Sequence, residues 1–530
     1  MNLKKRLKTP SRDICINKAR LNTNQHIIST MKQMKFVVCL LAVLTVNTAH
    51  AQLLRNLGNT IKQNTEKKEQ PSSQVSSQQE PATPAQQNGA TTSPASKQNN
   101  GTVYYVSKQG AARGADALSP ATAKKDIQAV LNIIKEKGDN GAIVRVAEGN
   151  YLGAANQGYI EIANFITLEG GWNESFTERD PMKYITKIEP GEEQRGTNGS
   201  KGLITTTRDL DDVMAKKPKG TLIIDGIMLN MGMENFYKPN NPDDERNGCP
   251  SAAFETGRME DATPPHIQHQ IFHSDGWIAG NVIIRNCLIA NSSYFGLQFG
   301  SRCGEVEIYN CVIISNRYGG VRIDGGDKDG KASHVNFHHN TVAFSWCRDK
   351  YMEDMGYGYE FMNKINGDVH HNIFLANNYA AVARTRVDTK DFEAIKVTNL
   401  YDNYFFLNAA DLQLPSKGGG KWTNIKCSDI EELVDEQTLP KAENNKELPA
   451  GDSFFDAVDK DYLEAFANLK IIAQSQNFDR SSASNQFRQA TGQNMQGSEI
   501  RRVSMYGNRY NFDKAMHLFG AKQGYGAQRP

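Results

Sequence analysis

The sequence predicts an all-β chain folded as a right-handed parallel β-helix, a solenoid with an N-terminal capping helix and a partly irregular C-terminal tail. Three observations predict this fold. A segment of strand, polar corner and strand recurs along the chain, asparagines occupy equivalent corners, and a second motif repeats in the same register. Such internal repeats are typical of solenoids, because each unit buries its apolar face only by stacking on its neighbours.

The recurring segment has six copies, which begin at Leu222, Val282, Val306, Val335, Asp368 and Asn399. Its equivalent corner positions are Gly226, Cys287, Cys311, Asn340, Asn372 and Asn403. The last four steps between these corners are 24, 29, 32 and 31 residues. The second motif begins at Ser292, Asn316 and Asn377 and aligns without gaps. One coil therefore takes about 24 residues, with insertions where a step is longer.

Stacked coils place like residues above one another at the spacing of neighbouring strands. We therefore expect Asn340, Asn372 and Asn403 to form a ladder whose side-chain amides satisfy backbone groups at the corners. Cys287 and Cys311 should stack as well, either as a small buried apolar ladder or as a disulfide. A β-sandwich or propeller is the competing architecture, but neither explains a repeat of this length with an asparagine corner.

The N-terminal cap is predicted from a helix opened by Ser119-Pro120. Its apolar residues recur at helical spacing and should face the first coil; they are Ile127, Val130, Leu131 and Ile134.

Residues 1–51 are predicted to be a leader that ends in a secretory signal peptide, with translation starting at Met31 or Met34. A basic start and a short apolar run precede a small-residue cleavage site between Ala51 and Gln52. Export to a secreted or cell-surface location is therefore expected. No later segment has the apolar length of a membrane-spanning helix.

Removing this leader changes the charge of the chain. The leader carries nine Lys and Arg residues and one Asp, so the formal net charge falls from +2 to about −6. A mildly acidic chain has no electrostatic reason to bind nucleic acid. Residues 52–101 are rich in Gln, Ser, Pro and Thr and almost lack apolar residues, which predicts a disordered linker.

Three further motifs carry a resemblance to a known family. They are the opening at 104–107, the turn at 147–151 and the segment Ile-Thr-Leu-Glu-Gly-Gly-Trp at 166–172. With the asparagine corners, they make residues 103–414 resemble the pectate-lyase-like superfamily of right-handed parallel β-helix proteins. The resemblance implies the fold, export and a carbohydrate-related role, but fold alone does not imply catalysis. The motifs of polygalacturonases and of pectate lyases are absent, so no catalytic residue is carried over.

This resemblance sets the predicted domain boundaries. The β-helix is expected over 102–417, and the C-terminal capping or irregular region over 418–530. Short helices are expected near 427–434 and 461–466, and this tail should cover the exposed edge of the last coil.

The strands that follow the second motif predict a row of outward side chains. Leu297, Val321, Tyr359 and Val382 should point inward, so the outward neighbours are Gln298, Arg322, Glu360 and Ala383. Asp324 lies two residues beyond Arg322, and Arg384 or Arg386 joins the row if that strand has a one-residue bulge. The long insertions at 230–274 and 346–355 are expected to flank the same face and so to form a groove along the row.

This row is one candidate for acid/base and charge-neutralising chemistry. The candidate catalytic residues are Arg322, Glu360, Asp324 and Arg384, and the candidate ligand-binding residues are Gln298, Tyr351 and Arg386. The alternative is a surface ladder of opposite charges that only stabilises the sheet.

Two other clusters are candidate metal sites. Asp324, Asp327 and Asp329 have a spacing that could hold calcium, although an exposed turn also favours Asp and Gly. His338-His339 and His370-His371 stand at equivalent corners, where they bind a metal, act as a base, or merely extend the corner ladder.

The sequence thus favours a secreted or surface-exposed β-helix that binds an acidic polysaccharide. Whether it also cleaves that polysaccharide, as a polysaccharide lyase or glycoside hydrolase, stays open at this stage. The alternative is a non-catalytic adhesin or surface antigen displayed on a flexible tether.

Overall fold

The computed structural model describes residues 100–151, 159–189, 202–231, 272–292, 294–316, 319–325, 333–345, 356–377, 379–385, 398–408, 410–415, 422–435, 439–463 and 509–530. Several predictions lie outside these residues. They concern the leader with its Ala51/Gln52 cleavage site, the linker, Tyr351, Arg386, Asp327 and Asp329.

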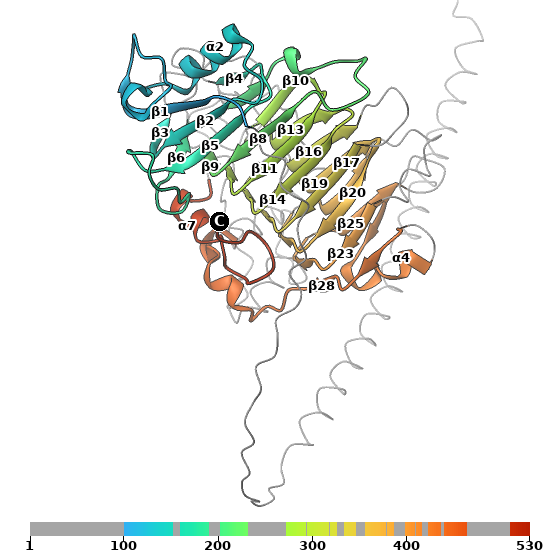
Figure 1. The fold of residues 1–530 in the computed structure, drawn as a ribbon. Helices are drawn as coiled ribbons and strands as arrows, with labels where there is room; N and C mark the ends of the chain where they lie inside the picture. Colours follow the sequence, from blue (N-terminus) through green and yellow to red (C-terminus); the bar gives the residue numbers. More distant parts are fainter. Residues whose placement is uncertain are drawn as a thin grey trace, which may run out of the picture. The chain divides into compact units, whose positions relative to one another are not determined.

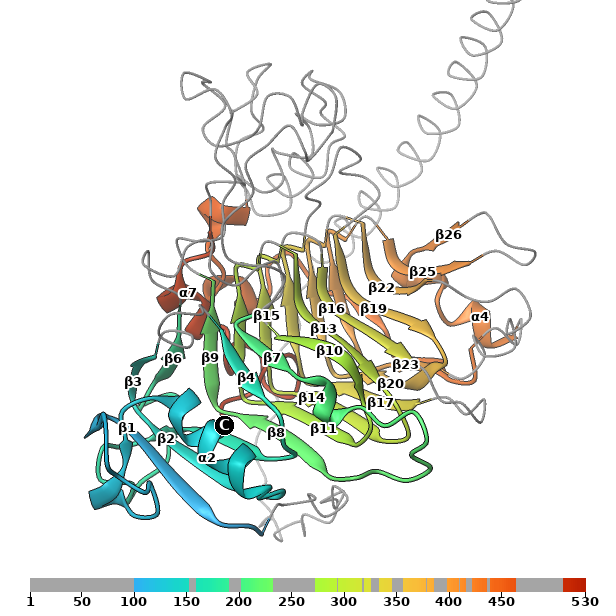
Figure 2. The same cartoon turned by 90° about the horizontal axis from the view of Figure 1, so that it is seen from above.

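Three long sheets form the solenoid (Figures 1 and 2). Sheet 1 runs in the order β1 (Val103–Ala111), β2 (Ile143–Ala147), β5 (Thr167–Trp172), β8 (Thr221–Asp225), β11 (Asn281–Arg285), β14 (Glu305–Tyr309), β17 (Ser333–His338), β20 (Ile365–His370), β23 (Thr398–Tyr401) and β27 (Ala442–Glu443). Sheet 2 runs β3 (Gly149–Tyr151), β6 (Thr186–Ile188), β9 (Ile227–Asn230), β12 (Leu288–Ala290), β15 (Val312–Ile314), β18 (Thr341–Ala343), β21 (Ile373–Leu375), β24 (Tyr404–Phe406) and β28 (Lys446–Glu447). Sheet 3 runs β4 (Ile160–Ile162), β7 (Ile204–Thr206), β10 (Phe272–Ile278), β13 (Phe295–Ser301), β16 (Gly319–Gly325), β19 (Tyr357–Asn363), β22 (Ala380–Thr385), β25 (Ala410–Pro415) and β26 (Trp422–Ile425).

Within each sheet, neighbouring strands come from successive coils and pair in parallel. The exception is β26, which turns back along β25 in antiparallel register. The predicted parallel β-helix is thereby confirmed, and parallel crossovers of this kind are almost always right-handed.

The asparagine ladder is also confirmed and has one more rung than predicted. The Asn340 amide donates to Asn372 Oδ1 at 3.1 Å, Asn372 to Asn403 at 3.0 Å, and Asn403 to Asn445 at 3.0 Å. Each Oδ1 also accepts from the backbone N–H of the asparagine one coil earlier, as Asn372 Oδ1 does from Asn340 N at 2.9 Å. A second ladder starts the strands of sheet 3, where Asn377 donates to Asn408 at 2.9 Å.

The first corner departs from the prediction by one residue. Asp225 pairs with Arg285 and Met228 with Leu288, so Gly226 is equivalent to Asn286 and Ile227 takes the place of Cys287. That position has a positive φ in every coil from β8 onward: Gly226 (68°), Asn286 (55°), Asn310 (51°), His339 (52°), His371 (56°), Asp402 (52°) and Asn444 (56°). Glycine and asparagine adopt this left-handed region most readily.

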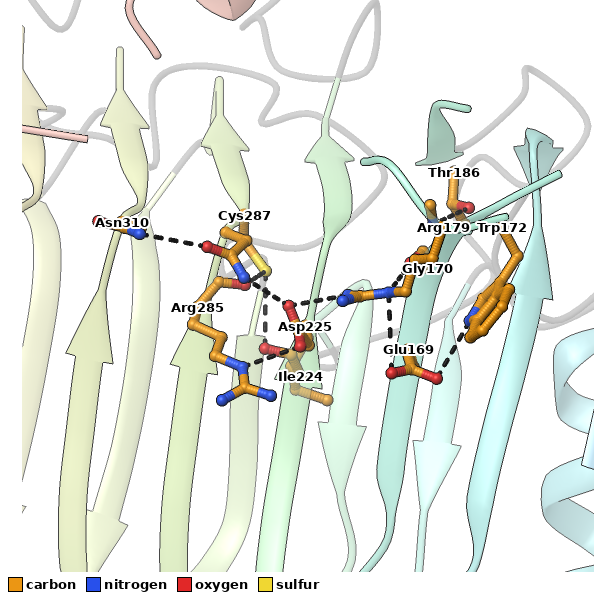
Figure 3. Close-up of polar contacts among 12 residues, drawn as sticks. Glu169, Gly170, Trp172, Arg179, Thr186, Ile224, Asp225, Arg285, Cys287 and Asn310 are labelled. Carbon is orange, nitrogen blue, oxygen red and sulfur yellow. Dashed lines mark hydrogen bonds and ion pairs between the residues drawn. The ribbon is translucent and has the colours of Figure 1, made fainter. Parts of the chain in front are cut away.

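Asp225, the residue before Gly226, is the centre of a network of charged side chains with Arg179 and Arg285, as Figure 3 shows. Asp225 is 1% exposed and pairs with Arg179 at 2.9 Å and with Arg285 at 2.8 Å. Asn286 Nδ2 donates to the same carboxylate at 2.7 Å. A Cβ on Gly226 would lie 2.8 Å from both Arg179 Nη2 and Pro181 Cγ. Glycine at this position therefore leaves room for the segment that contains Arg179 and Pro181.

The N-terminal cap is the helix α2 (Ile127–Lys137), whose four predicted apolar residues are all buried. Its start differs from the prediction. Asp126 caps the helix by accepting from Ala129 N, whereas Ser119 opens a separate 3-10 turn at Pro120–Thr122.

The C-terminal region has two roles instead of the one predicted. Ile425, Cys427, Ile430 and Leu439 join the solenoid core and close its last coil, as expected. Residues 448–463 and 509–530, however, pack on the outward apolar side chains of sheet 2, among them Leu288, Val312 and Ile373. The middle strands β12, β15 and β21 of sheet 2 have no exposed face, because all three residues of each strand are buried.

The described cysteines Cys287, Cys303, Cys311 and Cys427 are free thiols. Cys287 and Cys311 are both buried at the corner, which confirms an apolar ladder there over a disulfide.

Candidate functional site

The predicted outward row lies on sheet 3. Strand pairing aligns Gln298 with Arg322, Arg322 with Glu360, and Glu360 with Ala383. On the opposite side of these strands, Leu297, Val321, Tyr359 and Val382 are buried in the solenoid core, as predicted. The row begins one coil earlier than expected, because His273 on β10 pairs with Gln298.

A hollow of about 270 Å³ opens on this row. It is lined by His273, Ser274, Asp275, Gly276, Trp277, Gln298, Phe299, Gly300, Arg322, Asp324 and Met362. Three of the predicted site residues, Gln298, Arg322 and Asp324, are therefore brought together. Glu360 is not among the lining residues.

Glu360 instead holds Arg322 from the neighbouring strand β19. Arg322 Nε donates to Glu360 Oε2 at 2.6 Å and Nη2 donates to Oε1 at 3.1 Å. Thr385 Oγ1 donates to Oε1 at 2.5 Å, and Glu360 is only 2% exposed. A carboxylate engaged in this way is not placed to exchange a proton with a ligand. It orients the guanidinium, which also lies 4.3 Å from the ring centroid of Phe295.

One wall of the hollow comes from an irregular part of β10. The register between β10 and β13 shifts between His273 and Trp277. His273 Nε2 lies 3.5 Å from Asp275 Oδ1. The Trp277 indole lies across the next strand, where a Cβ on Gly300 would be 2.8 Å from the ring. Glycine at position 300 thus makes room for the indole at the edge of the hollow.

The structure removes Arg384 from the site. Strand β22 has no bulge, and Arg384 pairs with the inward residue Phe361 and is fully buried. Its Nη1 donates to the Ile365 carbonyl at 2.5 Å, and its guanidinium lies 5.2 Å from the Phe361 ring centroid. Strict alternation along β22 therefore places Arg384 inside the solenoid.

Sequence reasoning missed Asp275 and Trp277 as site residues and placed His273 in a loop. The segment His273-Ser-Asp-Gly-Trp277 repeats nowhere else in the solenoid, so no register could be assigned to it. The usable signal was Phe272, an apolar residue followed by polar ones directly after the longest insertion.

The calcium prediction is not tested. Among the residues that the structure describes, no three His, Cys, Asp or Glu side chains are grouped as a metal site would require. Asp324 lines the hollow, while Asp327 and Asp329 lie outside the described residues. No described helix is long and apolar enough to cross a membrane.

Comparison with known proteins adds no function. No protein-family model matches the chain, and no curated protein is significantly similar to it. A search of solved structures matched a pectin methylesterase mutant crystallised with a hexasaccharide, with a probability of 0.99, a TM-score of 0.25 and 10% identity. The match covers 68% of this chain and 96% of that one. The chain is a parallel β-helix. The expected resemblance to pectate-lyase-like proteins holds at the level of the fold, and this fold carries many unrelated activities.

Proposed function

We propose that the chain is an exported β-helix protein that binds an acidic polysaccharide in the hollow on sheet 3. The observation that carries this proposal is the guanidinium of Arg322, which lines that hollow and is fixed by Glu360. Glu360 takes two of the five guanidinium N–H donors and leaves the planar group in one orientation. Arginine held in this way suits the recognition of a carboxylate, such as that of a uronate residue.

The rest of the lining suits a sugar ring. A pyranose presents apolar C–H groups on its faces and hydroxyls around its rim. The Trp277 indole offers an apolar surface, while Gln298, Asp275 and Asp324 offer amide and carboxylate groups for hydroxyls. A hollow with apolar walls and a few converging polar groups is the usual form of a ligand site.

Cleavage of the bound chain is a second candidate, favoured by one observation. His273 lies 3.5 Å from Asp275 in the same hollow as Arg322 and Asp324. A histidine oriented by a carboxylate is a common general base. In a lyase reaction, the proton next to a uronate carboxylate held by Arg322 is removed, the glycosidic C–O bond on the next carbon breaks, and the departing oxygen takes a proton from solvent. In a hydrolase reaction, a water molecule that is deprotonated by a carboxylate adds across the broken glycosidic bond.

The experiment separates binding from cleavage. The purified chain is incubated with uronate-containing and neutral polysaccharides, and binding and the ultraviolet absorbance of unsaturated ends are followed together. Binding of the uronate chains, lost in Arg322→Ala, supports the proposal. Equal binding of neutral and acidic chains, or none at all, would favour the adhesin or surface-antigen alternative. An increase in the ultraviolet absorbance of unsaturated chain ends that is absent in His273→Ala would establish cleavage by a lyase reaction.

A further inference from the structure

The outward row on sheet 3 is exposed over a short part of its length. Strand pairing links seven of its residues in order: Thr205, His273, Gln298, Arg322, Glu360, Ala383 and Gln413. The middle residues His273, Gln298 and Arg322 are partly exposed, on three successive strands. The four residues on either side of them are at most 2% exposed. The row is therefore open only at its middle.

Beyond Arg322, the protein itself occupies the row. Glu360 is bonded to Arg322, and Ala383 belongs to a small buried apolar cluster. Gln413 Nε2 donates to Asn424 Oδ1 at 2.9 Å. Within the described residues, the row thus presents no exposed side chain on β19, β22 or β25 to a sugar chain that continues past Arg322.

On the other side, the row is closed at Thr205. Its hydroxyl accepts from Gly202 N at 3.0 Å and donates to the Gly202 carbonyl at 3.4 Å. All three residues of strand β7, which carries Thr205, are buried. A sugar chain that continues past His273 therefore meets a strand whose hydroxyl is already bonded within its own turn.

The hollow is also bounded along the strands. In β13 only Gln298 and Gly300 are partly exposed, and in β16 only Arg322 and Asp324 are. Arg302, the next outward residue after Gly300, is 8% exposed. The exposed part of these two strands is thus a small patch with buried residues around it.

We propose that the hollow binds the end of an acidic polysaccharide and not an internal stretch of it. At the spacing of neighbouring strands, His273 and Arg322 lie about 10 Å apart, which is the length of about two sugar rings. An internal stretch lying on the sheet has to leave the hollow on two sides, and the residues on those sides are buried. A terminal unit enters the hollow while the rest of its chain points away from the sheet.

This inference rests on the proposed function and adds which part of the glycan is bound. Two glutamines of the same row provide matched variants. Gln298 lines the hollow, whereas Gln413 lies three strands beyond Arg322 and is fully buried. Gln298→Met should weaken uronate binding about two- to tenfold, the effect of one lost hydrogen bond. Gln413→Met, a change of similar volume outside the hollow, should bind as the wild type does.

The number of protein molecules bound per sugar chain tests the inference. Calorimetric titration with oligouronates of defined length, from a trimer upward, gives this number together with the affinity. Binding at a chain end predicts one protein molecule per chain at every length, because each chain has one end of a given kind.

Two results would overturn the inference and leave the proposed function intact. They are a number bound per chain that rises with chain length, and weaker binding of long chains by a folded Gln413→Met protein. Absence of binding at every length would refute the proposed function, and the inference with it.

Discussion

Glu360 and Arg322 form the best-buried ion pair of the outward row, joined by hydrogen bonds of 2.6 and 3.1 Å. The pairing means that the two residues, which looked equivalent as candidate catalytic groups, have different tasks. Arg322 lines the hollow, and the buried Glu360 on the neighbouring strand fixes the orientation of its guanidinium. The surface-ladder alternative therefore describes the role of Glu360, which pairs across the strands, and the ligand-site prediction describes the role of Arg322, which lines the hollow.

Removal of Glu360 alone should lower the stability of the folded protein. Glu360→Ala leaves the largely buried Arg322 without its carboxylate, which should lower the free energy of unfolding by about 3 kcal/mol or more. Urea denaturation followed by circular dichroism measures this. Thr385→Val, which removes only one hydroxyl donor to Glu360, should cost less than half as much. A Glu360→Ala protein as stable as the wild type would show that the pair contributes little.

The asparagine ladder should be most sensitive at its centre. Asn372→Ala removes the acceptor of Asn340 N and the donor to the Phe337 carbonyl, so two buried backbone groups lose partners. At about 1–3 kcal/mol for each, the loss should be about 2–6 kcal/mol. Asn445, on the last rung, likewise accepts from Asn403 N and donates to the Leu400 carbonyl, but Asn372 also donates to the next asparagine of the ladder, Asn403. Asn445→Ala removes one hydrogen bond fewer and should cost less. Equal losses at both positions, measured by urea denaturation, would argue against a cooperative ladder.

The first corner should reject the residue that later corners contain. Gly226→Asn places a Cβ 2.8 Å from Arg179 Nη2 and Pro181, so it should disrupt the Asp225 network despite a suitable φ. We expect a loss of several kcal/mol, on the order of a broken buried ion pair. Asn310→Gly at the equivalent position should cost about 1 kcal/mol or less. Similar melting temperatures for the two variants would contradict this account.

Asp411 should make stability depend on pH in a predictable direction. Burial raises the pKa of its carboxyl, although Cys427 N and Asn408 Nδ2 donate to it and Lys426 is nearby. A raised pKa in the folded state means that its contribution is complete below the unfolded value of 3.8 and is lost as pH rises through the folded value. The stability of the wild type relative to Asp411→Asn should therefore fall as pH rises from about 3.8. Denaturation series at several pH values give this difference, and a constant difference would exclude the effect.

The repeat made most of the solenoid predictable from sequence. Residues such as Asn340, Asn372 and Val321 recur at fixed positions, so one register assigns the inward and outward faces of several coils at once. The His273–Trp277 wall could not be predicted, because it occurs once and its strand contains a register shift. Arg384 was misplaced because a buried arginine is rare, and a bulge seemed the simpler way to expose it. The covering of sheet 2 by residues 509–530 was hidden as well, since contacts such as Tyr510 with Asn291 span 219 residues.

The central claim is that the hollow binds acidic sugar through Arg322, and one titration tests it most directly. Arg322→Met/Glu360→Gln removes both charges of the buried pair, so no unpaired ion remains and the fold should persist. Calorimetric titration with a uronate oligosaccharide should give binding for the wild type and for Lys441→Met, a control outside the hollow, and at least about a tenfold loss of affinity for the double variant, or 1.4 kcal/mol. Wild-type affinity in a folded double variant would contradict the account.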